Sequence, residues 1–198
     1  RPGVGGNVPG YRLTAYSWIL LATAALAAAM GALVRRRRAP RCATYLAILQ
    51  LLIAEWAFSA AMEAAAPTIA ATRLWGQIGY LGTVFSPMLY FLFAYHYLDT
   101  QHRASWRLIA ALSIVPTLAL VAAATSSMHT LLWTGITRDP VTGVAHYGHG
   151  PAFYVLVTYC WVMVAAGVWC LLRAMLRFSA HYRVQTAILL AASVLPCI

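Results

Sequence analysis

The sequence predicts an all-α fold, a polytopic bundle of transmembrane helices with five complete spans and part of a sixth. Its composition is the first reason: 62% of the 198 residues are hydrophobic and 9% are charged, with a mean hydropathy of +0.73. An ordinary soluble domain is about a quarter charged. The second reason is that the apolar residues form runs of roughly 20, which as helices cross a hydrocarbon core about 30 Å thick.

The elements follow in order along the chain. Residues 1–12 are polar and rich in glycine and proline, so we expect a flexible lead-in before a bundle that occupies residues 13–198. The five expected spans are residues 13–34, 42–65, 74–98, 108–125 and 152–176. A sixth begins near Val184 and is still apolar at Ile198. We therefore expect the chain to be a C-terminally truncated piece of a longer membrane protein.

The basic residues predict the orientation of the bundle. Ten of the 14 arginines lie in the connectors after the first, third and fifth spans, and half of these ten are Arg35, Arg36, Arg37, Arg38 and Arg41. Arginine is retained on the cytoplasmic side, so the N-terminus is expected outside. The arginine run then sets the topology and contacts anionic lipid headgroups. The net charge of +10 alone would suggest nucleic acid, but a seven-residue connector offers little surface, and no nucleic-acid partner is expected.

Two carboxylates lie within the second span. An ionisable group in hydrocarbon is costly and usually faces the bundle interior beside a partner. Glu55 is near the middle of the span, and Glu63, eight residues on, faces the same broad side. Glu55 is either a structural hydrogen-bonding group or part of a ligand or proton site. In the third span Pro87 frees a backbone carbonyl and is expected to kink the helix.

The loop at residues 126–151 is expected on the outer side. Residues 128–133 are predicted to form a short amphipathic helix on which His129 and Trp133 share a face. The stretch "DPVTG" at 139–143 predicts a turn. His146 and His149 lie nearby, but the segment is rich in glycine and no cysteine or carboxylate cluster accompanies them, so no metal is expected.

A set of residues, in this order on this topology, resembles a known family. The set is Trp56 and Glu63, then Arg73 before Trp75, then "GYLG" and Pro87, then His129 and Trp133 four apart, then Tyr159, then Tyr182, Arg183, Gln185 and Pro196. It resembles the N-terminal seven-helix membrane region of bacterial histidine kinases, which is sometimes found before diguanylate cyclases. The resemblance runs from about residue 17 to the end. The family has seven spans, and this chain shows five and a part.

The resemblance implies a sensory input domain, multi-pass in the bacterial inner membrane, with a cytoplasmic signalling module such as a histidine kinase in cis. It also implies a homodimer of the full-length protein. The segment shows no catalytic constellation and suggests no cofactor. We expect an unknown small ligand to bind in a pocket with aromatic walls and a few polar groups, lined by Glu63, Trp75, Tyr80, His129, Trp133 and Tyr159. Structural or proton-linked roles are expected for Glu55, Pro87 and Gln185.

Two alternatives remain open from the residues. A structural accessory subunit of a larger membrane complex would suit the first span, which is rich in alanine and glycine and allows close helix approach. A small transporter would use polar groups at the midplane of the bilayer, where Glu55 is the only charge, but the halves of the chain show no internal repeat.

Overall fold

The computed structural model describes residues 10–36, 41–99, 104–139 and 145–177, together with Thr186 and Leu189. This part of the chain forms five helices and one two-stranded hairpin, in the order α1 (Ala15–Arg36), α2 (Arg41–Ala65), α3 (Ile69–Leu98), α4 (Trp106–Ala124), β1 (Trp133–Arg138), β2 (Ala145–His149) and α5 (Pro151–Arg177). All five helices are long and apolar enough to cross a membrane. The predicted polytopic helical bundle is therefore confirmed, and the chain is a multi-pass membrane protein.

The third helix begins five residues before the predicted start of its span. Thr68 caps its N-terminus, because the Thr68 side chain accepts a hydrogen bond from the backbone N–H of Ala71 at 3.1 Å. Such a cap satisfies one of the backbone donors that the first turn leaves unpaired. The helix therefore includes residues 69–73, which precede the predicted span.

The outer loop differs from the prediction. The expected helix at residues 128–133 is wrong: β1 begins at Trp133 and pairs antiparallel with β2, so an all-α description leaves out this hairpin. Tryptophan, threonine and isoleucine in β1 favour strand, and cross-strand pairing satisfies their backbone groups. Most of the predicted turn at 139–143, together with Arg37, Arg38 and Gln185, lies outside the described residues.

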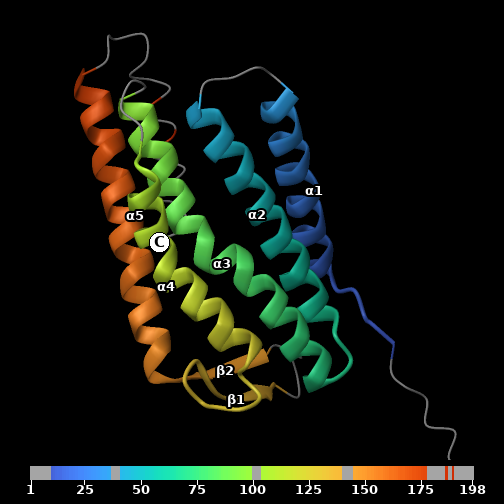
Figure 1. Cartoon of the computed structure of the whole chain (residues 1–198). Helices are drawn as coiled ribbons and strands as arrows, with labels where there is room; N and C mark the ends of the chain where they lie inside the picture. Colours follow the sequence, from blue (N-terminus) through green and yellow to red (C-terminus); the bar gives the residue numbers. More distant parts are fainter. Residues whose placement is uncertain are drawn as a thin grey trace, which may run out of the picture.

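Helix α3 is the centre of the bundle. It packs against α2, α4 and α5, while α1 packs on α2 (Figure 1). A core at the level of the hairpin joins α3, α4, α5 and β1, and includes Tyr80, Ala119, Trp133 and Leu156. Two further clusters, around Leu92 and Leu171, continue the core along α3. One helix therefore contacts every layer of the core from end to end.

The two ends of the bundle differ in charge as predicted. Arg35 and Arg36 end α1, and Arg177 ends α5, at the end opposite the hairpin (Figure 1).

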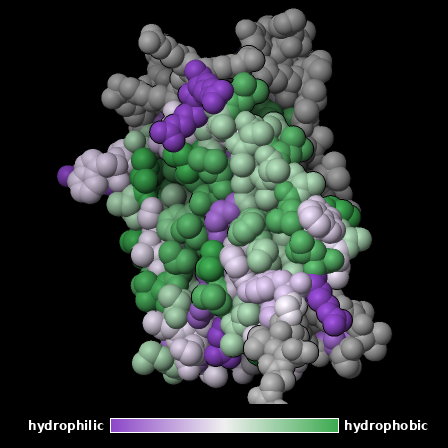
Figure 2. Space-filling model, turned by 90° about the vertical axis from the view of Figure 1, so that its right-hand side faces the viewer, coloured by the Kyte–Doolittle hydropathy of each residue, from purple (hydrophilic) through white to green (hydrophobic). Residues whose placement is uncertain are grey.

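Between the ends, the face that carries α1 is mainly hydrophobic (Figure 2). Trp18, Ile19 and Leu26 of α1 are exposed. This is the surface expected of helices that contact lipid. Following the orientation expected from the arginines, we refer to the arginine-rich end as the cytoplasmic end and to the hairpin end as the outer end.

Helices α2 and α3 approach each other closely at Gly82. A Cβ atom at this position would lie 2.5 Å from the carbonyl oxygen of Leu52, which is backbone and cannot move aside. The backbone N–H of Gly82 donates to the Glu55 carboxylate at 2.9 Å, and Ser59 Oγ donates to the same carboxylate at 3.1 Å. Glu55 therefore forms an interhelical hydrogen bond that depends on glycine at position 82.

Replacing Gly82 with alanine should separate α2 from α3. We expect Gly82→Ala to destabilise the bundle by about 1–3 kcal/mol, the usual cost of overpacking a core. Gly135→Ala, where a Cβ would meet nothing within 4 Å, is the matched control. Thermal unfolding in detergent micelles measures both. Equal melting temperatures for the two variants would contradict the close approach.

The orientation predicts opposite labelling of two exposed positions, Thr137 on β1 and Arg177 at the end of α5. Each is replaced singly with cysteine in a background whose four native cysteines are alanine. A membrane-impermeant maleimide should label position 137 in intact cells, and position 177 only after permeabilisation. The reverse pattern would overturn the orientation.

Candidate ligand-binding cavity

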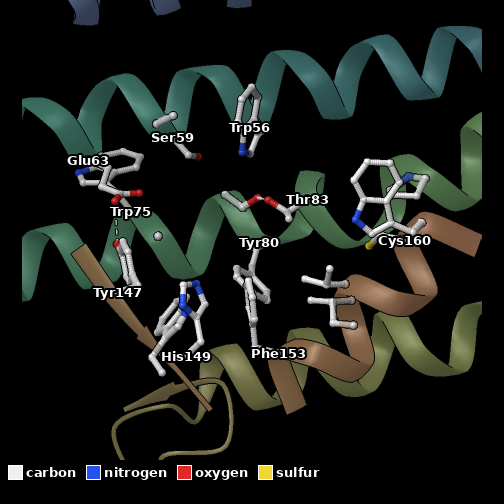
Figure 3. A pocket seen from close by; sticks show the side chains of 18 of the residues that line it. Trp56, Ser59, Glu63, Trp75, Tyr80, Thr83, Tyr147, His149, Phe153 and Cys160 are labelled. Carbon is white, nitrogen blue, oxygen red and sulfur yellow. Dashed lines mark hydrogen bonds between the residues drawn. The ribbon is translucent and has the colours of Figure 1, made fainter. Parts of the chain in front are cut away.

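A cavity of about 480 Å³ lies in the outer half of the bundle, between α2, α3, α5 and the hairpin (Figure 3). Its walls are mainly apolar and aromatic. The residues that line it are Trp56, Ser59, Ala60 and Glu63 of α2, Trp75, Gly76, Gly79, Tyr80, Thr83 and Pro87 of α3, Trp133, Tyr147 and His149 of the hairpin, and Phe153, Leu156, Val157, Cys160, Trp161 and Val164 of α5. Both the volume and the composition are those of small-molecule sites.

A hydrogen bond between α2 and the hairpin closes the outer end of the cavity. Tyr147 Oη of β2 donates to Glu63 Oε1 at 2.7 Å (Figure 3). Gly76 of α3 makes room for this bond, because a Cβ there would lie 2.7 Å from the Tyr147 hydroxyl. Bonds to a charged acceptor are stronger than neutral ones. The carboxylate is therefore held at the cavity wall by the hairpin.

Aromatic rings extend this outer wall. The Trp133 ring meets Tyr80 edge-to-face, with centroids 5.3 Å apart, and meets Tyr147 at 5.1 Å. Both distances are in the range that aromatic pairs prefer. The ring centroids of His149, at the end of β2, and Phe153, in the first turn of α5, lie 3.8 Å apart. The hairpin is thus packed onto α3 through rings that also line the cavity.

Trp75 joins the cavity to the N-terminal segment. Its indole N–H donates to Tyr11 Oη at 2.9 Å, and its ring meets Phe58 edge-on at 5.7 Å. The backbone N–H of Arg12 donates to the carbonyl of Ala65 at 3.0 Å. The last residues of the predicted lead-in therefore lie against the outer ends of α2 and α3.

The structure brings four of the six predicted pocket residues together, namely Glu63, Trp75, Tyr80 and Trp133. Pro87 lines the deeper part of the same cavity. The hypothesis did not include Trp56, Tyr147, Phe153 and Trp161. Tyr147 and His149 could have been found from strand alternation in "AHYGH", since residues two apart in a strand share a face.

His129 does not line this cavity. It lies in a smaller polar hollow of about 300 Å³ beside Arg73 and Ser126, on the other side of Trp133. His129 Nδ1 accepts from the backbone N–H of Leu131 at 3.3 Å, so the proton is assigned to Nε2, which donates to Thr125 Oγ1 at 2.9 Å. The hydrogen bonds of this ring thus hold the turn between α4 and β1.

Tyr159 also lies outside the cavity. Its hydroxyl donates to the carbonyl of Leu112 at 2.7 Å and links α5 to α4. Cys160 and Val157, which line the cavity, are about 100° and 200° away around the helix. The tyrosine therefore faces the α4 side. Glu55, held by Ser59 and Gly82, is likewise not among the lining residues.

The described residues contain no group of three or more His, Cys, Asp or Glu side chains that could hold a metal ion. Within this part of the chain, the arrangement suits an organic molecule. It offers a carboxylate at the outer end and ring faces around an apolar interior.

Comparison with known proteins gives a family match. Residues 19–198 match the family described as the N-terminal 7TM region of histidine kinase. No curated protein and no solved structure matches the chain. The family has seven spans and the described residues contain five. Since the match covers more than half of the sequence, the chain belongs to the family of N-terminal seven-transmembrane regions of histidine kinases.

Proposed function

We propose that this region is the sensory input domain of a bacterial inner-membrane protein and that it binds a small ligand in the cavity. The single observation that supports ligand binding most is the cavity itself, which has aromatic walls and one carboxylate. Membership of the family supports the sensory role and implies a cytoplasmic signalling module in cis. The full-length protein would act as a homodimer, with its arginine-rich connector against anionic headgroups.

Helix α3 would carry the signal inward. It lines the cavity from Trp75 to Pro87 and continues to Leu98 at the cytoplasmic end. Pro87 removes one backbone hydrogen bond between the two halves of this helix. Ligand occupancy would favour one of two packings of α3 against α2 and α5.

The cytoplasmic end of α3 contacts the chain that follows α5. Tyr97 Oη and Thr186 Oγ1 share a hydrogen bond of 3.2 Å, and Leu189 packs near Ala94 and Leu171. A shift of α3 would therefore change contacts with the segment that leads toward an output module. This contact is the reason to propose that α3 transmits the signal to the output module. Helix α1, which packs on α2 at the edge of the bundle, is not proposed for this role.

The transporter alternative relied on Glu55 as a midplane charge. Glu55 is instead held by Ser59 and the Gly82 N–H outside the cavity, which favours a structural role. Among the described residues, no specific contact favours an accessory subunit. The sensory function is the one that both the cavity and the family support.

Filling the cavity should mimic or block the ligand. Val157 lines the cavity, whereas Val162 on the same helix is 54% exposed and is not among the lining residues. We expect Val157→Trp to change ATP-dependent phosphorylation of the full-length protein in membrane vesicles by about fivefold or more, since allosteric coupling is typically 1–3 kcal/mol. Val162→Trp should behave like wild type. Unchanged phosphorylation in both variants, with both correctly inserted, would contradict coupling of the cavity to the output.

Tyr147 and Glu63 should act as one unit through their hydrogen bond. We expect Tyr147→Phe and Glu63→Ala to shift phosphorylation in the same direction, and the double variant to match the single ones within about twofold, because each removes the same bond. Tyr154→Phe, at an exposed ring of α5, is the control. Additive effects in the double variant would show that the two residues act separately.

A further inference from the structure

We propose that the polar hollow beside Trp133 is a second binding site, and that it binds a phosphate oxyanion, either free or on a lipid headgroup. The hollow lies at the outer end of the bundle, where the start of α3 meets the turn between α4 and β1 (Figure 1). Its volume of about 300 Å³ is at the lower end of the range typical of small-molecule sites. The hollow is separate from the cavity of the proposed function, since Trp133 alone is shared by the described residues that line the two.

The charge of the hollow favours an anion. Arg73 is the only arginine among the described residues that line it, and no aspartate or glutamate is among them. His129 is assigned as neutral, because its Nδ1 accepts from the Leu131 N–H while its Nε2 carries the proton. Within the part of the chain that the structure describes, the Arg73 guanidinium makes no hydrogen bond or ion pair. Guanidinium groups bind phosphate oxygens through paired hydrogen bonds. A phosphate would therefore supply a partner for this cation.

Arg73 faces the end of α4. Arg73 and Gln77 are four residues apart, so they lie on the same side of α3. Gln77 Nε2 donates to the carbonyls of Ala123 and Ala124 at 3.0 and 3.4 Å. It also lies 3.2 Å from Ser126 Oγ, to which it donates. Carbonyls at the C-terminal end of a helix oppose an anion. The Gln77 amide occupies two of these carbonyls and so reduces that opposition.

The Ser126 hydroxyl supplies a buried donor. This side chain is 8% exposed and lines the hollow. Because its Oγ accepts from the Gln77 amide, its own proton is left to donate. No acceptor for that proton occurs among the described residues. Three further hydroxyl residues, Ser127, Thr130 and Thr134, also line the hollow. Donors on α3, in the turn and on β1 suit an anion whose acceptor oxygens point in several directions, as those of phosphate do.

Three probes test the site: inorganic phosphate, dihexanoylphosphatidylglycerol and acetate. Binding is measured by isothermal titration on the full-length protein in dodecyl maltoside, a detergent without phosphate, at constant ionic strength and with protein-free micelles subtracted. We expect wild type to bind at least one of the two phosphate probes, and to bind acetate more weakly than that probe. Arg73→Gln should weaken binding by about tenfold or more, because hydrogen bonds to a charged group are lost. Ser126→Ala should weaken it by about threefold or more.

Arg12→Gln is the matched control. It removes the same charge at the same end of the bundle, where the Arg12 backbone contacts Ala65, and Arg12 is not among the lining residues of the hollow. This variant should bind the probes like wild type. Melting temperatures measured without probe show that each variant is folded.

The two phosphate probes separate the sources of the anion. Tighter binding of inorganic phosphate assigns a soluble anion, and tighter binding of the lipid assigns a headgroup; both support the site. Equal weakening in Arg73→Gln and Arg12→Gln would reduce the effect to net charge and overturn the site. Unchanged binding in Arg73→Gln, tighter binding of acetate than of either phosphate probe, or no binding of any probe by wild type would overturn it as well.

Discussion

The absence of water in the hydrocarbon core is the constraint on which the rest of this structure depends. Every backbone polar group within the bilayer needs a partner in the protein, and helices supply one within each segment. Hydroxyl side chains in the spans follow the same rule. Thr23, Ser113 and Thr158 donate to the backbone carbonyl four residues earlier, at 2.8 to 2.9 Å. The hairpin, which has an open strand edge, lies at the outer end of the bundle (Figure 1).

The same constraint separates the two carboxylates of α2. Glu55 is near the middle of the span and is held by Ser59 and the Gly82 N–H. Glu63 is two residues from the end of the helix, where a tyrosine from the hairpin reaches it. The carboxylate near the middle of the span therefore has a packing role, and the one near the helix end lies at the closed outer end of the cavity. At this level the rings of Trp133 and Tyr147 line the cavity together with residues of α2, α3 and α5.

The spans, their number up to residue 177 and the arginine-rich end could be predicted from the sequence. Hydropathy and charge are properties of the residues themselves, and predicting from them needs no knowledge of tertiary contacts. The helix prediction failed at residues 128–133, where pairing of β1 with β2 outweighed the helical spacing of His129 and Trp133. Four of the residues proposed for the ligand pocket line the cavity; three of them are aromatic or acidic groups in spans, and Trp133 is in the outer loop. Tyr159 lies outside the cavity and bonds to α4, and a hydrophobic run does not reveal which helix each face meets. Trp161 and Trp56 could not be distinguished from lipid-facing residues without the neighbouring helices.

A distance measurement between the cytoplasmic ends of α4 and α5 tests most directly whether the cavity is coupled to the output. Spin labels at the exposed positions Trp106 and Leu176 report the separation of these ends in the full-length protein in nanodiscs. Occupation of the cavity by the Val157→Trp side chain should shift the distance distribution. Val162→Trp, at an exposed position outside the cavity, should leave it as in wild type. Identical distributions in wild type and both variants would mean that filling the cavity does not change the packing of the helices at the cytoplasmic end.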